Sequence, residues 1–374
     1  MKFLGMAAAL VMGFSTMALA GEKVMITDVA NRQVEVELPV KNVILGEGRL
    51  IYGIAALDRD DPFARIVGWR DDLIKFDPQT YAVYHAKYPE IGNIPTFGGV
   101  KEGTFDVEQA IALNPGIVIM NLESRGATED AGLDAKLASV GIPLVYIDFR
   151  EAAMHNTEPS LKILGQLYGK PELAQELIDF RSEQIEAITR VITRENPQRP
   201  VVFVERAAGY SDECCMSFGN ENFGMMVEMA GGINMAANII PGTFGTVNPE
   251  QVVASNPDQI IATGANWEAS VPGGAWVGLG PNADRAIARQ KLAALMDRPA
   301  FTGVKAVEDK QVHAVWHQFY NSPYQFVVIQ QMAKWLHPDL FPDLDPQAAF
   351  RELHERFLPI DYDAGYFVSL TDED

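Results

Sequence analysis

The chain has 374 residues, with 30 lysines and arginines against 50 aspartates and glutamates, which gives a formal net charge of −20. A chain of this length usually folds as two domains. Its acidity argues against a nucleic-acid partner, because phosphate binding needs clustered basic side chains. Two cysteines cannot build a disulfide framework or a cysteine-rich zinc site. After the first twenty residues, no stretch is apolar enough for a membrane span.

Residues 1–20 have the pattern of a signal peptide. The basic Lys2 precedes an apolar run that ends near residue 17, and Ala-Leu-Ala at 18–20 matches the motif that signal peptidase cleaves. An N-terminal core helix is the alternative, but the polar residues directly after the run favour export. We expect a mature protein that begins at Gly21 and lies free in a Gram-negative periplasm. No cysteine lies near the cleavage point, so we expect no lipid anchor.

The first half of the mature chain is predicted to contain a small hairpin, formed by residues 24–26 and 34–36, and then a parallel α/β sheet. Short apolar runs separated by helical patterns have the length of buried parallel strands. These runs are Val43–Leu45, Arg65–Gly68, Ile117–Met120 and Leu144–Ile147.

One long helix is predicted near the middle of the chain. Residues 171–195 contain no glycine and no internal proline, and their apolar residues recur near helical spacing. Pro171 suits the first turn, and Asn196-Pro197 ends the helix. Twenty-five residues at about 1.5 Å each give about 37 Å. We therefore predict a connecting segment, 171–196, between an N-terminal lobe, 21–170, and a C-terminal lobe, 197–374. An amphipathic helix that belongs to one lobe is the alternative.

The second half repeats a unit of the first. Residues 103–119 and 245–261 are identical at eight of seventeen positions, with a constant offset of 142. In each copy a helical turn led by Glu-Gln ends at Asn-Pro, and an apolar run follows. The second-half strands are expected at Val201–Val204, Gln259–Ala262 and Val312–Trp316. The predicted fold class is α/β, with two Rossmann-like lobes of mainly parallel strands joined by one long helix.

The adjacent Cys214 and Cys215 are the two cysteines of the chain. An exported protein lies where disulfides can form, so the pair is either a local disulfide clamp or two buried thiols, and the sequence leaves both open. A redox-catalytic role needs Cys-x-x-Cys spacing, which is absent.

An ordered set of motifs runs over essentially the whole mature chain. It comprises Ile-Thr-Asp with Arg-Gln-Val at 26–34, Ile-Val-Gly-Trp at 66–69, Pro-Glu-Ile-Gly at 89–92, the two Glu-Gln…Asn-Pro segments, Ala-Gly-Gly-Ile-Asn at 230–234 and the segment 299–312. This set resembles the class III periplasmic substrate-binding proteins of ABC importers, the group that binds ferric siderophores, haem and cobalamin.

The resemblance implies that a ligand is captured between two lobes and delivered to an inner-membrane ABC permease dimer. In relatives, one surface glutamate on each lobe pairs with permease arginines, and Glu108 and Glu250 occupy equivalent positions of the repeat. The alternative is that glutamate simply favours the first turn of a helix. We expect a monomer without a cofactor of its own. Its ligand is expected to be an Fe(III) chelate, namely a ferric siderophore.

Ligands of open α/β sheets lie beyond the carboxyl ends of the strands. Arginine and aromatic residues are frequent at those positions here, which suits a flat or aromatic ligand with negative charge. The residues predicted to bind substrate are Arg49, Trp69, Arg70, Arg206, Tyr210, Trp267, His317 and Tyr320. Other residues at these ends are Glu47, Gly48, Asn121, Glu123, Ser124, Asn266 and Phe319. His317 and Tyr320 are also possible direct ligands to iron, although a hydrogen-bonding role suits His317 better.

Other functions have weaker support. Haem and cobalamin are alternatives within the same class, and cobalamin would leave the arginines unexplained. A bare-metal binder would need clustered ligands, whereas the six histidines are scattered. No nucleotide-binding loop, nucleophile elbow or zinc-protease motif is present, so we expect no enzyme activity. An exported hydrolase remains a remote alternative.

Overall fold

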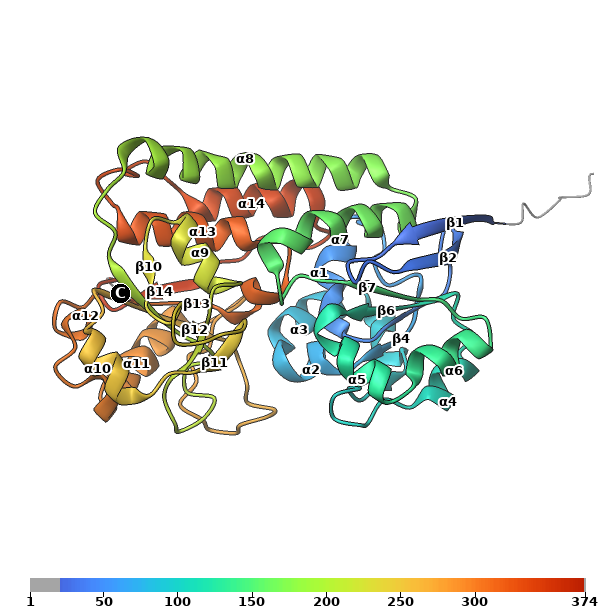
Figure 1. Ribbon diagram of the computed structural model, residues 1–374, viewed down its shortest axis with the longest axis horizontal. Helices are drawn as coiled ribbons and strands as arrows, with labels where there is room; N and C mark the ends of the chain where they lie inside the picture. The colour runs from blue at the N-terminus through green and yellow to red at the C-terminus, as the bar shows by residue number, and fades with distance from the viewer. Residues whose placement is uncertain (1–20, 373–374) are drawn as a thin grey trace, which may run out of the picture.

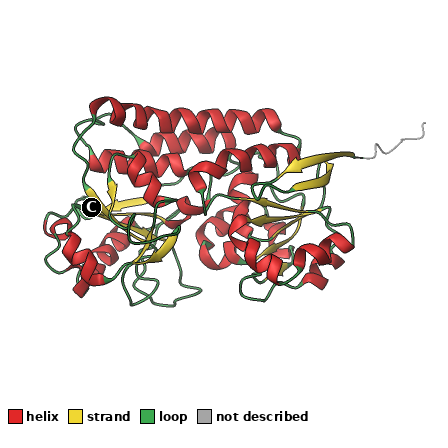
Figure 2. Ribbon diagram, viewed as in Figure 1, coloured by secondary structure: helices red, strands yellow, loops and turns green. Residues whose placement is uncertain are grey.

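The computed structural model describes residues 21–372 as two α/β lobes that lie side by side under a layer of helices (Figures 1 and 2). The expected signal peptide, residues 1–20, lies outside the described residues. Among residues 21–372, no helix combines the length and the apolarity that a membrane crossing requires.

The first lobe contains a five-stranded sheet in the order β5-β4-β3-β6-β7, and every neighbouring pair is parallel. An antiparallel hairpin of β1 (Glu22–Thr27) and β2 (Gln33–Leu38) precedes it. The sheet strands are β3 (Val43–Leu45), β4 (Ile66–Arg70), β5 (Thr96–Phe97), β6 (Ile117–Asn121) and β7 (Leu144–Ile147). The helices are α1 (Ile51–Ala55), α2 (Asp72–Phe76), α3 (Pro78–Lys87), α4 (Val107–Ala112), α5 (Arg125–Asp130), α6 (Leu133–Ser139) and α7 (Ala153–Tyr168), with short 3-10 turns η1 (Gly48–Leu50), η2 (Pro89–Asn93) and η3 (Leu122–Ser124).

The second lobe contains a sheet in the order β10-β8-β12-β13-β14, parallel except that β14 runs antiparallel to β13. A separate antiparallel pair joins β9 to β11. The strands are β8 (Val201–Glu205), β9 (Met216–Phe218), β10 (Ile233–Asn234), β11 (Phe244–Thr246), β12 (Gln259–Gly264), β13 (Val312–Trp316) and β14 (Phe367–Ser369). The helices are α9 (Phe223–Met229), α10 (Pro249–Ser255), α11 (Arg285–Leu295), α12 (Lys305–Glu308), α13 (Gln325–Leu336) and α14 (Pro346–Phe357), with 3-10 turns η4 (Pro299–Phe301) and η5 (His317–Asn321).

The long helix, α8 (Pro171–Glu195), begins and ends where the sequence predicts. Pro171 occupies its first turn, and Asn196 ends it in the left-handed conformation. The helix packs against α7 of the first half and α13 of the second, and Figure 1 shows it running along the top of both lobes. It therefore connects the two halves. The exact lobe limits, 21–170 and 197–374, stay a prediction, although the two five-stranded sheets fall on either side of α8.

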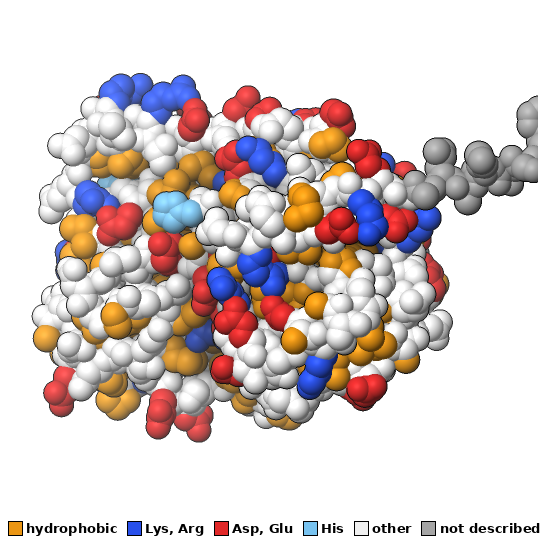
Figure 3. Space-filling view, turned by 45° about the vertical axis from the view of Figure 1, so that its right-hand side comes forward, with side chains coloured by type: hydrophobic (Ala, Val, Ile, Leu, Met, Phe, Trp, Pro, Cys, Tyr) orange, Lys and Arg blue, Asp and Glu red, His pale blue; other side chains and the backbone are white. Residues whose placement is uncertain are grey.

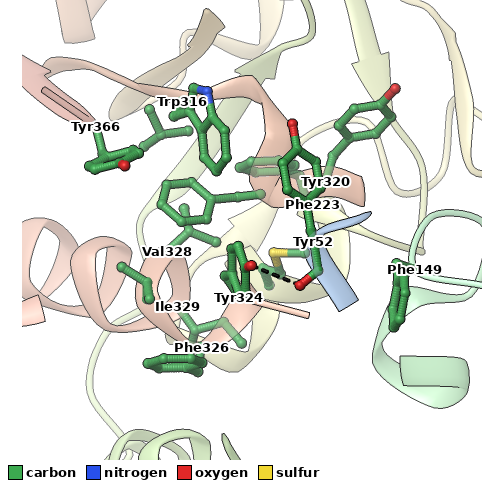
Figure 4. Packing of buried hydrophobic residues seen from close by; sticks show 14 of the residues in the cluster. Tyr52, Phe149, Phe223, Trp316, Tyr320, Tyr324, Phe326, Val328, Ile329 and Tyr366 are labelled. Carbon is green, nitrogen blue, oxygen red and sulfur yellow. Dashed lines mark hydrogen bonds between the residues drawn. The ribbon is translucent and has the colours of Figure 1, made fainter. Parts of the chain in front are cut away.

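Aromatic side chains join the lobes beneath this helix. Tyr52 of α1 contacts Trp316 and Tyr324 of the second half, with ring centroids 5.7 and 6.1 Å apart. The Tyr324 hydroxyl donates a hydrogen bond of 2.8 Å to the Tyr52 carbonyl, as Figure 4 shows. All three rings are at most 4% exposed. The lobes thus share one continuous apolar core.

The predicted fold class and the predicted strands are confirmed. Five short strands, namely β5, β9, β10, β11 and β14, were not foreseen, because strands of two or three residues carry little periodic signal. One boundary matters for the site. The predicted strand 65–68 extends as β4 to Arg70, so Trp69 is part of the strand and does not follow it.

Candidate ligand-binding site

A cavity of about 290 Å³ lies where the carboxyl ends of both sheets face each other. Basic and acidic side chains lie next to one another near the middle of the face drawn in Figure 3. The cavity is lined by Arg49, Arg70, Phe76, Lys101, Glu102, Glu123, Ser124, Arg150, Arg206, Ala207, Tyr210, Met216, Trp267, His317 and Tyr320. Seven of the eight predicted substrate-binding residues therefore meet in one place, as the rule for open sheets leads one to expect.

Arg49 is held at the base of the cavity by buried partners. Its Nε lies 2.7 Å from Asp72 Oδ2, and its Nη1 donates at 2.9 Å to both Gln318 Oε1 and Tyr320 Oη. Gly48 makes this turn possible, because a Cβ there would lie 2.4 Å from the Arg70 carbonyl oxygen. The guanidinium of Arg49 therefore links the first lobe to the second.

Arg150 follows β7 and is bracketed by two carboxylates. One arm of its guanidinium contacts Glu47 and the other contacts Glu123, whose second oxygen binds Lys101. Burial alone would lower the pKa of Arg150, but Glu47, Tyr320 and Glu123 outweigh that effect and raise it. Arg150 is thus a fixed cation with its counter-ions already in place.

Arg206 is different, because no carboxylate partner is found for it among residues 21–372. It follows β8, and its guanidinium lies 4.7 Å from the Phe244 ring centroid and 3.9 Å from Met216 Sδ. Its Nε is buried without a hydrogen-bond partner in the described chain. Burial lowers the pKa of Arg206, yet an arginine keeps its charge at neutral pH. The cavity wall therefore carries one cation that is not neutralised locally.

His317 begins η5, directly after β13, and is buried and neutral. Its Nδ1 lies 2.8 Å from the Thr263 hydroxyl, which accepts the Ala207 N–H at 2.8 Å. The Thr263 hydroxyl can donate to Nδ1 or accept from it, so the contact is compatible with an imidazole proton on either ring nitrogen. Burial, together with Arg206, Arg49 and Arg150, lowers the pKa of His317 well below its usual value. With the proton on Nε2, His317 donates a hydrogen bond from that atom, and with the proton on Nδ1, Nε2 has a lone pair for a ligand.

Aromatic rings line the cavity beside the arginines. Trp267 meets Tyr210 edge-on at 5.3 Å and His317 edge-on at 5.4 Å, and the rings of His317 and Tyr320 lie 4.3 Å apart. Tyr320 also lies under Arg150, with 4.9 Å from the guanidinium carbon to the ring centroid. A planar or aromatic ligand could stack here while its anionic groups reach the guanidinium groups.

The expected position of Trp69 at the cleft is wrong. Because β4 continues through this residue, its ring points into the core, where it is 0% exposed and contacts Phe63 and Tyr81. Sequence reasoning also missed Arg150, although it follows the predicted strand 144–147 and the strand-end rule applied there would have found it. Lys101 and Glu102 could not be found in this way, since they follow β5, a strand of two residues.

Of the other strand-end residues, Glu123 and Ser124 line the cavity, and Glu47 lies buried beside it. Phe319 is in the core. Among residues 21–372, no group of three or more His, Cys, Asp or Glu side chains is arranged to hold a metal ion.

Cys214 and Cys215, which are neighbours in sequence, form a disulfide. Of the two alternatives that the sequence left open, the structure shows the local disulfide clamp and not two buried thiols. It directly precedes Met216, which lines the cavity and whose carbonyl accepts the Arg206 N–H at 2.8 Å. The Cys215 carbonyl in turn accepts the Val247 N–H at 3.0 Å. The disulfide thus lies beside the segment that supports Arg206.

Glu108 and Glu250 lie outside the cavity, in the first turns of α4 and α10. Both are exposed, and the side chains that cap the two helices, Asp106 and Asn248, also occupy equivalent positions of the repeat. In Figure 1, α4 and α10 lie at opposite ends of the molecule, on the side away from α8. The repeat therefore presents two equivalent carboxylates on one side of the protein.

The sequence and the fold match a known family. The family model for periplasmic binding proteins matches residues 69–316. The chain belongs to this family. It is a periplasmic binding protein of the ABC-importer type, and the resemblance noted in the sequence is confirmed. The family consists of solute-binding proteins, and its members dock to ABC permeases. None of the curated proteins matches the chain.

Solved structures agree with this assignment. The TroA-like periplasmic binding protein FepB from Veillonella parvula is 29% identical, with 93% of this chain and 100% of that chain covered and a TM-score of 0.83. MolA from Haemophilus influenzae, bound to molybdate, is 18% identical over 91% of this chain and 99% of its own, with a TM-score of 0.68. The haem-binding protein RhuT from Roseiflexus is 18% identical over 80% and 99%, with a TM-score of 0.57. The last two likenesses concern the fold alone.

Proposed function

We propose that this protein binds an anionic ferric chelate, most specifically a ferric siderophore, and delivers it to an inner-membrane ABC permease. The proposal rests on one observation about Arg206. This largely buried cation lies on the cavity wall, and it has no carboxylate partner in the described chain. A buried charge without a partner costs free energy, and an anionic ligand group that accepts hydrogen bonds from Arg206 would repay that cost.

The aromatic wall supports a chelate over a small oxyanion. Trp267, Tyr210 and Tyr320 offer ring faces and edges to a ligand with planar chelating groups. Molybdate is the ligand of the Haemophilus influenzae relative. It would bind the arginines but would have no planar group to stack on these rings. Iron enters as part of the cargo, and the proposal does not need a protein side chain in its coordination sphere.

Haem is the second candidate, because His317 and Tyr320 both line the cavity and one relative binds haem. Its disadvantage is that the Tyr320 hydroxyl already accepts a hydrogen bond from Arg49. His317 is hydrogen-bonded to Thr263 through Nδ1, which does not engage its Nε2. Cobalamin would not account for Arg206, whose charge calls for an anionic ligand group.

Delivery would use the two carboxylates of the repeat. Glu108 lies on the first lobe and Glu250 on the second. Both are exposed, and they occupy equivalent positions of the repeat in the first turn of a helix. A permease dimer has two-fold symmetry, which two equivalent contacts match. We propose that they bind basic side chains of the two permease subunits, and that the protein acts as a monomer in the periplasm after cleavage at Gly21.

The test is tryptophan fluorescence of the purified mature protein, titrated with ferric catecholate, hydroxamate and citrate chelates, haem, cobalamin and molybdate. Saturable quenching by one ferric chelate at submicromolar concentration would support the proposal. Trp267→Phe is the matched probe, because this ring lies on the cavity wall, and it should remove much of the response. If haem or molybdate alone binds tightly, the proposed ligand is wrong and that titrant takes its place. If no titrant gives a response, the whole proposal is wrong.

A further inference from the structure

Two carboxylates line the cavity together with the cations, and they differ in position. Glu102 pairs with Arg70 at 2.9 Å, and its side chain is 52% exposed. The Glu123 side chain is only 19% exposed, and its two oxygens engage Lys101 and Arg150. Glu123 is thus the carboxylate that lies deepest on the lining of the cavity.

Glu123 is ionised in the folded protein. Burial by itself would raise its pKa, but Arg150 and Lys101 outweigh burial and hold the pKa at about 2. At neutral pH the cavity therefore contains a permanent negative charge on its wall, next to the cations that an anionic ligand would need.

The other carboxylates near these cations have a different role. Glu47 and Asp72 lie beneath Arg49 and Arg150, with side chains 2% and 0% exposed, and neither lines the cavity. They orient the guanidinium groups from behind and cannot be displaced by a ligand. Glu123 instead lines the cavity itself and contacts Nη1 of Arg150, so it holds a cation that a ligand anion could otherwise bind.

We propose that Glu123 sets the charge selectivity of the site. As a built-in counter-ion, it neutralises Lys101 and one arm of Arg150 and repels further negative charge, which leaves Arg206 as the main attraction for an anion. The site then favours chelates of low net negative charge over highly anionic ones. This inference rests on the proposed function and adds the charge class of the ligand.

The test compares two simple ferric chelates, the neutral tris-hydroxamate and the trianionic tris-catecholate, by titration calorimetry. Glu123→Gln keeps the size of the side chain and removes its charge. At separations of ~6 Å, one unit of charge changes affinity about threefold for each ligand charge in bulk water, and by more near the protein surface, where the effective dielectric constant is lower. We expect Glu123→Gln to tighten binding of the trianionic chelate by about tenfold or more, and to change affinity for the neutral chelate much less.

Three further variants complete the design. Glu129→Gln is the matched control, because Glu129 pairs with Arg125 on α5, outside the cavity lining, and it should leave both affinities at the wild-type values. Lys101→Met removes a partner of Glu123 and should shift selectivity the opposite way, toward the neutral chelate. Glu123→Ala, a second variant without the charge, keeps the test decisive if thermal melting shows that Glu123→Gln fails to fold.

The outcomes separate this inference from the proposed function. If the wild-type protein binds a chelate but Glu123→Gln changes both affinities equally or not at all, the selectivity role is wrong and the proposed function stands. An increase confined to the trianionic chelate supports the role. If the wild-type protein binds neither these probes nor any other ferric chelate, the proposed function fails and this inference fails with it.

Discussion

Replacing the unpaired arginine of the cavity should separate binding from stability. Arg206→Met removes the charge and keeps an apolar side chain against Phe244 and Met216. A hydrogen bond to a charged group contributes about 1.5 to 3 kcal/mol, so the affinity for an anionic ferric chelate should fall by about 10- to 150-fold. The stability of the empty protein should change by less than about 1 kcal/mol, because relief of the desolvation cost offsets the lost contact with Phe244.

Arg298→Met is the matched control. Arg298 pairs at 2.6 Å with Glu205, whose side chain is 3% exposed, and Arg298 does not line the cavity. Its loss leaves a buried carboxylate unpaired and should destabilise the protein by about 3 to 5 kcal/mol, with chelate affinity retained wherever the variant is folded. Urea unfolding gives the stabilities, and calorimetric titration gives the affinities. If Arg206→Met weakens binding by less than about twofold, or destabilises the protein as much as the control, the reasoning is refuted.

Three other predictions follow from the same structure. Changing Glu108 and Glu250 together to lysine should abolish stimulation of the permease ATPase and leave ligand affinity intact, and wild-type stimulation would rule out the docking proposal. Reducing the Cys214–Cys215 disulfide should lower the free energy of unfolding by only about 1 kcal/mol, because a crosslink between neighbours barely restricts the unfolded chain; urea unfolding with and without reductant would contradict this if several kcal/mol were lost. Burial lowers the pKa of His354 to about 4, so between pH about 6.5 and about 4 the unfolded chain binds a proton that the folded chain does not. Stability should therefore fall as the pH falls, by about 1.4 kcal/mol per pH unit from this group, and His354→Phe should remove that share of the slope in unfolding measured across this range.

Much of the fold could be predicted from local sequence. Helix α8 was predicted to the residue, because Pro171 and Asn196-Pro197 act through backbone geometry and need no tertiary partner. The apolar runs of β3, β7 and β13 were found because a strand buried on both faces is apolar along its length. The edge strands β5 and β10 were missed, since pairing with a neighbouring strand defines them more than their own residues do.

The site divides in the same way. The sequence by itself determined which chain segments contribute, because the carboxyl ends of parallel strands must meet at one edge of each sheet, and this placed Arg49, Arg206 and His317 correctly in one cavity. Only the tertiary structure decided which cationic side chains lack a carboxylate partner and can therefore bind an anionic ligand. That Arg150 is neutralised by Glu47 and Glu123 while Arg206 is not, and that Trp69 is buried, depends on side chains that are far apart in the sequence. Salt screens charge interactions beyond about 8 to 10 Å at ordinary ionic strength, so such pairings exist only once these chain segments have packed together in the folded lobe.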